Sequence, residues 1–102
     1  MAKTLAKLPP MHPGEMLREE FLTPLGLSAL RVARAAGVPR TRIERFLRGE
    51  TGVSADTALR LGKVLGTTPE FWINLQTRYD VLTARTAIAA ELAEIPALVA
   101  AA

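Results

Sequence analysis

The chain has no cysteine, one histidine and only five aromatic residues among 102. Without cysteine it forms neither disulfide bonds nor thiolate zinc sites, and this composition fits a reducing cytoplasm. With so few aromatic residues, the core must be built from leucine, alanine, valine and isoleucine, which suits helices. A chain of this length is expected to form about one domain with a single modest core.

Signals for membrane insertion, secretion and catalysis are also missing. The longest strongly apolar run, residues 96–102, is far too short to span a membrane, and the N-terminus lacks the apolar core of a secretory signal. His12 has no metal-binding partner at helical spacing, so we expect it to cap a helix or to pack. No nucleophile with a base and no phosphate-binding glycine loop is present. The sequence therefore predicts a cytoplasmic protein that is not an enzyme and holds no metal or cofactor.

Two short helical patterns occupy residues 27–49, LSALRVARAAGVPRTRIERFLRG. Ser28 is a good N-cap for the first pattern, and Gly37 suits a corner that needs a positive φ. Pro39 can open the second pattern, because the first turn of a helix tolerates its missing amide. Gly49 closes the second pattern. Small alanines allow the two helices to cross closely, so the stretch predicts a helix-turn-helix.

The second helix of this motif has one apolar face and one basic face. Ile43, Phe46 and Leu47 recur at i, i+3 and i+4 and are expected to be buried. The opposite face is expected to expose Arg40, Thr41, Glu44, Arg45 and Arg48. Arginine binds guanine edges with two hydrogen bonds, and threonine contacts a thymine methyl group or a phosphate. Glu44 either accepts from a cytosine amine or pairs with an arginine one turn away, and the pair is favoured.

Charge is concentrated in this motif. Residues 29–48 contain six arginines and one glutamate, a local charge of +5, which leaves −2 for the rest of a chain whose net charge is +3. A basic face on an otherwise slightly acidic domain is typical of nucleic-acid binding. The alternative is a solvated, arginine-rich helix pair in an ordinary all-α protein.

Further helices are predicted on both sides of the motif. Residues 1–12 read as an extended arm, followed by a helix that begins at Pro13 and is stopped by Pro24 and Gly26. Ser54 is expected to cap a mostly buried helix at 55–65, in which Leu59 is counted among the buried residues. Helical periodicity continues beyond Asp80 to residue 95, and residues 96–102 are expected to fray. The predicted domain therefore spans residues 13–95.

Another helix is predicted from Thr68 onward, and it carries most of the aromatic residues. Phe71, Trp72, Leu75 and Tyr79 recur along it at helical spacing. The four preceding helices can already cover one another, so this stripe suggests a second surface that requires burial, as in a dimer. Packing of the same residues into the monomer core is an equally open interpretation.

Three segments of the chain resemble a known family. HPGEMLREEFLTPLGLS at 12–28, the helix-turn-helix, and VSADTALRLGKVLGTTPEFWINLQTRYDVLTAR at 53–85 closely resemble the HigA-type antitoxins, also called VapI-type. These belong to the wider phage-repressor-like helix-turn-helix class. The resemblance covers about residues 11–85. Its most specific parts are HPGE with REEFL and the segment TPEFWINLQTRYD.

The resemblance implies a five-helix, all-α repressor-like domain with an extended C-terminal helix. Such proteins are homodimers that bind an inverted repeat in their own promoter and neutralise a neighbouring RelE-like toxin, which cleaves mRNA on the ribosome. By motif position, Arg40, Thr41 and Arg45 correspond to residues that contact base edges, and Ser28, Arg42 and Arg48 to residues that hold phosphates. The segment with Phe71, Trp72 and Leu75, which Tyr79 extends, corresponds to the dimerisation region.

The sequence departs from related repressors at two places. Ala29 and Leu30 stand where many carry a glutamine that supports a base-contacting residue, and Pro39 replaces the usual polar cap. Both departures bear on base preference. Two other functions stay open: a solitary regulator without a toxin, and a protein-interaction domain that no longer binds DNA, which the retained arginines disfavour.

Overall fold

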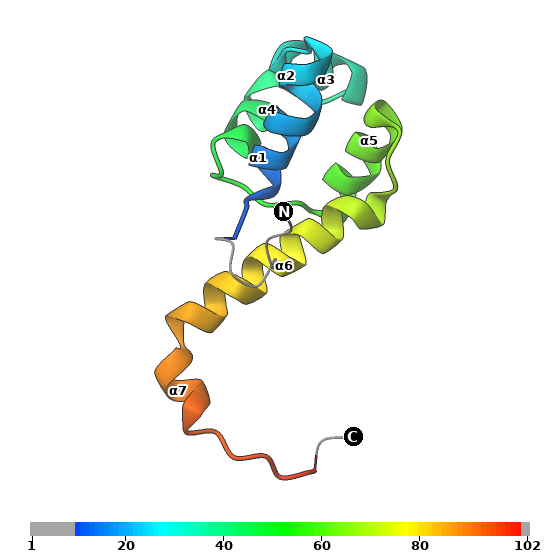
Figure 1. Cartoon of the computed structure of the whole chain (residues 1–102). Coiled ribbons are helices and arrows are strands. Elements are labelled where there is room, and N and C mark those ends of the chain that lie inside the picture. Colours follow the sequence, from blue (N-terminus) through cyan, green and yellow to red (C-terminus); the bar gives the residue numbers. More distant parts are fainter. Residues whose placement is uncertain (1–9, 101–102) are drawn as a thin grey trace, which may run out of the picture.

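Every regular element in the part of the chain that the structure describes is helical (Figure 1). The structure is a computed structural model, and it describes residues 10–100. The elements in order are α1 (Pro13–Leu17), the π turn η2 (Arg18–Leu22), α2 (Thr23–Leu25), α3 (Ala29–Ala36), α4 (Arg40–Leu47), α5 (Ala55–Leu65), α6 (Pro69–Ala87) and α7 (Ala89–Ala93). The all-α expectation is confirmed. Residues 1–9 of the predicted arm and residues 101–102 of the predicted tail lie outside the described residues.

The first three elements form one continuous helix with a π turn in its middle. His12 caps it, since its Nδ1 accepts from the Gly14 amide at 2.9 Å, which confirms the expected capping role. Pro24 does not stop this helix as expected, because the chain widens into the π turn just before it. That register avoids the clash and the lost bond that proline causes in a regular α-helix. Gly26, with φ +63°, ends it.

The core lies where α1, α3, α4, α5 and the first half of α6 meet. Its buried side chains are Leu17, Leu22, Val32, Ala33, Ile43, Phe46, Ala58, Leu61 and Trp72. Trp72 is the largest of them and is fully buried, with its indole N–H donating to Thr67 Oγ1 at 2.7 Å. The expectation that Leu59 is buried is wrong, because the residue lies on the solvent side of α5 and is 61% exposed.

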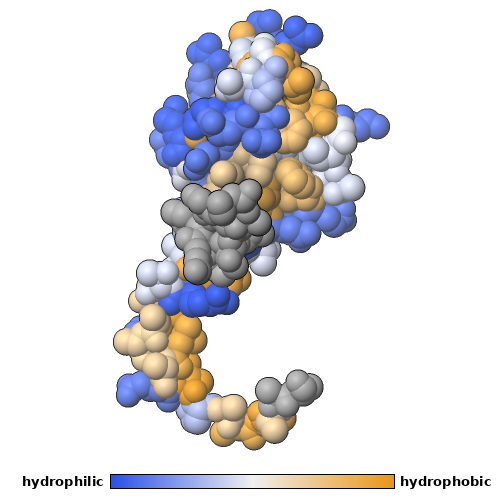
Figure 2. Space-filling model, in the orientation of Figure 1, coloured by the Kyte–Doolittle hydropathy of each residue, from blue (hydrophilic) through white to orange (hydrophobic). Residues whose placement is uncertain are grey.

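The C-terminal part of the chain projects away from this core (Figure 1). The second half of α6 runs beyond the body, and the helical path breaks at Ile88, with φ −113° and ψ 24°, before α7. Residues 95–100 carry no helix. Hydrophobic residues line the projecting segment (Figure 2), including the exposed Val81 and Leu92. None of the helices within residues 10–100 combines the length and the hydropathy that spanning a bilayer requires.

Candidate nucleic-acid interface

Helices α3 and α4 form the helix-turn-helix with the predicted caps. Ser28 Oγ accepts from the Arg31 amide at 3.1 Å at the start of α3. Gly37, with φ +73°, makes the corner, a backbone conformation that glycine adopts without steric cost. Pro39 differs from the expectation by one position: it is the extended N-cap residue of α4, and the helix begins at Arg40.

Helix α1 supports α4 from behind. A Cβ atom on Gly14 would lie 1.9 Å from the main-chain oxygen of Phe46, so the two backbones approach as closely as glycine allows. Arg18 Nη2 donates to the main-chain oxygen of Leu47 at 2.8 Å, in the last turn of α4. The His12 ring packs between Phe46 and Tyr79, with ring centroids 5.7 and 5.1 Å away. These contacts fix α4 against the body and leave its other face to solvent.

That outer face is as basic as predicted. It comprises Arg40, Thr41, Glu44, Arg45 and Arg48, which we call the exposed face of α4. Ile43 and Phe46 lie on the opposite side, 3% and 2% exposed. The sequence therefore placed these five residues on the correct side of the helix. Whether they contact DNA stays a prediction.

Carboxylates accompany the arginines of this face. Arg40 Nε lies 3.4 Å from Glu44 Oε2, the pairing that the sequence favoured for Glu44. Beyond the end of α4, Glu50 accepts from Arg48 Nε at 2.7 Å and lies 3.6 Å from Arg45 Nε. The hydrogen bond from Arg48 is the main cause that lowers the pKa of the Glu50 carboxyl, and the same contact raises the pKa of Arg48.

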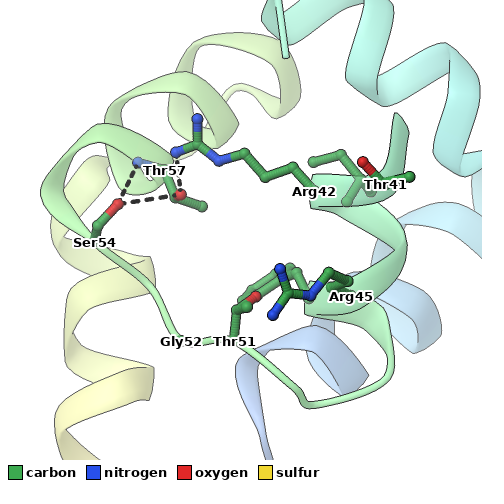
Figure 3. Close-up of a pocket in the computed structure, with 9 residues that line it drawn as sticks. Thr41, Arg42, Arg45, Thr51, Gly52, Ser54 and Thr57 are labelled. Atoms are coloured by element: carbon green, nitrogen blue, oxygen red, sulfur yellow. Dashed lines mark hydrogen bonds between the residues drawn. The ribbon is translucent and has the colours of Figure 1, made fainter. Parts of the chain in front are cut away.

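Arg42 points elsewhere, toward α5 (Figure 3). Its Nη2 donates to Asp56 Oδ2 at 2.6 Å and to the buried Thr57 Oγ1 at 2.7 Å. Arg60 Nε donates to the same Asp56 oxygen at 2.9 Å, and Arg60 Nη1 donates to the main-chain oxygen of Ala36 at 2.6 Å. Hydrogen bonds from Arg42 and then Arg60 lower the pKa of the Asp56 carboxyl. This network joins α4 and α5 to the end of α3, so the side chain expected to hold a phosphate is already bound to α5, while 38% of it stays exposed.

A cleft of about 320 Å³ lies between α4 and the loop that leads into α5 (Figure 3). Its polar lining comes from Thr41, Arg42, Arg45, Thr51, Ser54 and Thr57. Ser54 caps α5 as predicted, accepting from the Thr57 amide at 3.1 Å. Gln76 of α6 holds the loop in place, since its Oε1 accepts from the Val53 amide at 2.8 Å. The loop is thus tied to α6 as well as to α5.

Two basic residues that the sequence analysis counted without assigning a role lie on the outer surface of α3. Arg31 and Arg34 are exposed beside Ser28, and neither side chain forms an ion pair with the part of the chain that the structure describes. Their spacing of three residues, opposite the buried Val32 and Ala33, was the available signal. Glu50 was missed because nothing in its local pattern shows where the chain returns after Gly49.

The four residues expected at a dimer interface differ in exposure. Trp72 has no exposed surface, so its side chain serves the monomer core and cannot itself touch a partner in this conformation. Phe71, Leu75 and Tyr79 are half-buried. Phe71 packs edge-on against Trp72, with ring centroids 5.1 Å apart. Trp72 therefore belongs to the monomer core, and dimer contact by Phe71, Leu75 and Tyr79 stays a prediction.

Comparison with known proteins gives consistent matches. A helix-turn-helix family model matches residues 17–72. Virulence-associated protein I of Dichelobacter nodosus is 48% identical over 75 residues, which cover 74% of this chain and 69% of that protein. Antitoxin HigA-1 of Vibrio cholerae is 40% identical over 85 residues, covering 83% of this chain and 78% of that protein. The solved structure of antitoxin GraA in complex with its operator has a TM-score of 0.84 at 48% identity, covering 98% of this chain and 100% of that chain.

Proposed function

The chain belongs to the HigA-type antitoxins of the helix-turn-helix family, and we propose that it represses its own operon as a dimer and neutralises a RelE-like, mRNA-cleaving toxin. The family is one of DNA-binding regulators and antitoxins, and it is not an enzyme class. A protein that binds its operator acts where the DNA is, so we propose a cytoplasmic location.

The exposed face of α4 is the observation that supports DNA binding most strongly. The side chains of Arg40, Arg45 and Arg48 are 57%, 57% and 55% exposed, on a helix that is buttressed from behind by α1. A second helix of a helix-turn-helix enters the major groove with its N-terminal residues against base edges. GraA, to which the chain is similar over nearly its whole length, was solved in complex with its operator.

Individual roles follow from position on α4 and α3. We propose that Arg40, Thr41 and Arg45 contact base edges and that Glu44 orients Arg40. Ser28 and Arg48 hold phosphates, and the exposed Arg31 and Arg34 add sequence-independent attraction. Arg42 Nη2 donates to both Asp56 and Thr57, so we assign this residue to positioning α4 in place of the phosphate contact.

The proposed dimer uses α6. Phe71, Leu75 and Tyr79 keep partial exposure on that helix, and Trp72 supports them from the core. The same helix continues into the projecting segment, whose exposed apolar residues would also be covered by a second copy. Two recognition helices in a dimer enter successive major grooves about 34 Å apart, so the operator is expected to be a pseudo-palindrome.

Toxin neutralisation is proposed to involve the folded body, near the first helix. Glu15, Glu19 and Glu20 are exposed there, and an acidic face complements a basic RelE-like protein. The other candidate function is a solitary regulator of the same fold. A short adjacent gene for a basic RelE-like protein, whose product copurifies with this chain, would support the antitoxin function. Failure of that product to bind would leave the solitary regulator.

Fluorescence anisotropy on the protein's own upstream DNA tests the repressor function. A scrambled duplex of equal length is the control, at near-physiological salt. We expect the native fragment to bind at least about a thousandfold more tightly, the lower range for specific DNA-binding proteins. Equal binding to both duplexes would reduce the basic face to a phosphate-binding patch and would refute sequence-specific repression.

A further inference from the structure

Glu50 forms ion pairs with two arginines at the C-terminal end of the recognition helix, α4. Gly49, with φ +77°, turns the chain back, and the Glu50 amide donates to the main-chain oxygen of Arg45 at 2.9 Å. The carboxylate then accepts from Arg48 Nε at 2.7 Å and from Arg48 Nη2 at 3.4 Å, while its Oε1 lies 3.6 Å from Arg45 Nε. One residue outside the helix therefore fixes two side chains on its exposed face.

The contact with Arg45 uses the inner edge of its guanidinium and leaves the outer end available, whereas Arg48 faces Glu50 with Nη2 as well as Nε. Arginine has five N–H donors, and those on its two terminal nitrogens donate to the O6 and N7 atoms of guanine. In Arg45 it is Nε that faces Glu50, so both terminal nitrogens remain for a base. A long side chain held in this way needs less ordering when it binds than a freely rotating one.

A carboxylate in this place also works against phosphate binding. Arg31 and Arg34 on α3 have no acidic partner within residues 10–100, whereas Arg45 and Arg48 share Glu50. If Arg45 served only to attract the DNA backbone, the neighbouring negative charge would weaken it. A hydrogen bond to a base edge forms only when the arginine is correctly oriented, whereas a phosphate attracts any exposed arginine.

We propose that Glu50 is a specificity-determining positioning residue: it orients Arg45 toward base edges and disfavours binding to DNA of other sequence. The inference rests on the proposed operator binding. Replacing the carboxylate should therefore lower the affinity for the operator and raise the affinity for DNA of other sequence. A change that merely loosened the fold would lower both.

The test uses Glu50→Gln, which removes the charge and keeps the size. Glu94→Gln is the matched control, since it makes the same charge change in the exposed C-cap residue of α7, a helix that lies far from α4 (Figure 1). Anisotropy titrations on the upstream fragment and on the scrambled duplex are run over a series of salt concentrations. For Glu50→Gln we expect operator affinity to fall about tenfold and affinity for the scrambled duplex to rise about threefold. Glu94→Gln should leave the ratio of the two affinities at the wild-type value.

A double variant shows whether Glu50 acts through Arg45. In the Arg45→Ala background, Glu50→Gln should lower operator affinity much less than it does in the wild type, because the side chain to be oriented is gone. The inference is overturned if Glu50→Gln leaves the ratio unchanged while the wild-type protein discriminates between the duplexes. If the wild-type protein itself binds both duplexes equally, operator binding fails, and this inference fails with it.

Discussion

Arg42 is the third residue of the recognition helix α4, and a 2.6 Å ion pair joins it to Asp56. This pair directs the Arg42 side chain toward α5. The same guanidinium donates to Thr57 Oγ1. Asp56 also accepts from Arg60, which donates to the main-chain oxygen of Ala36 at the end of α3. The angle between the two helices of the motif is thus held by side chains of α5. A sequence pattern that places an arginine on a recognition helix does not distinguish this role from contact with DNA.

Arg42→Ala should therefore lower the midpoint of thermal unfolding by several degrees, because it leaves Thr57 without one of its partners and disconnects α4 from α5. The dependence of operator affinity on salt concentration should keep its slope, since no phosphate contact is lost. A slope reduced by about one unit, with unchanged stability, would instead establish Arg42 as a phosphate ligand.

Arg40→Ala and Arg45→Ala should each lower operator affinity by about 1–3 kcal/mol and relax the preference at one operator position. The reason is that a bidentate contact to a guanine edge is lost while the phosphate contacts remain. Competition with operators substituted at single positions identifies the relaxed base pair. An equal loss on operator and scrambled DNA would contradict base contact by that residue.

Arg31→Ala and Arg34→Ala should weaken binding to every duplex alike. Each removes one exposed positive charge from α3, so the salt slope should fall by about one unit per substitution. The folded state should keep its thermal midpoint, because both residues are exposed. Salt titrations on operator and scrambled duplexes measure both slopes, and an unaltered slope would remove α3 from the DNA-binding surface.

Gly14→Ala should destabilise the protein by about 2 kcal/mol or more. The new Cβ atom would meet the main-chain oxygen of Phe46, so either α1 or the recognition helix must shift. Urea unfolding followed by circular dichroism gives the change in the free energy of unfolding. Glu15→Ala, at the exposed next position, is the control and should stay within about 0.5 kcal/mol of the wild type. Equal stability of both variants would show that the helices can separate without cost.

Acidification should destabilise the fold through Asp56 and Glu50. Arginine neighbours lower the pKa of both carboxyls in the folded state, Arg42 foremost for Asp56 and Arg48 for Glu50. A carboxyl with a lowered pKa stabilises the folded state above its ordinary value, 3.8 for aspartate and 4.5 for glutamate, and this contribution is lost as the pH falls through the lower, folded-state value. Thermal midpoints of the wild type should therefore drop below pH about 4, and Asp56→Asn should show a shallower drop. Parallel pH profiles of the two proteins would exclude Asp56 as a contributor.

Local sequence determined the helix-turn-helix and its exposed face. The Ser28 and Ser54 caps and the Gly37 corner depend on bonds and dihedral angles within a few residues, so residue type was sufficient to predict them. The same holds for the five residues on the exposed face of α4, because a helical period of 3.6 fixes which side chains oppose Ile43 and Phe46.

Only the tertiary structure decided which of these side chains are free to bind. Arg42 is engaged by Asp56, fourteen residues away, and Trp72 is buried by helices from earlier in the chain. Glu50 reaches Arg45 and Arg48 because Gly49 reverses the backbone, and Gly14 lies against Phe46 because α1 packs across α4. Periodicity states which face of a helix a residue occupies. The partner it meets there comes from another segment, and only the packing of the whole chain brings that segment into place.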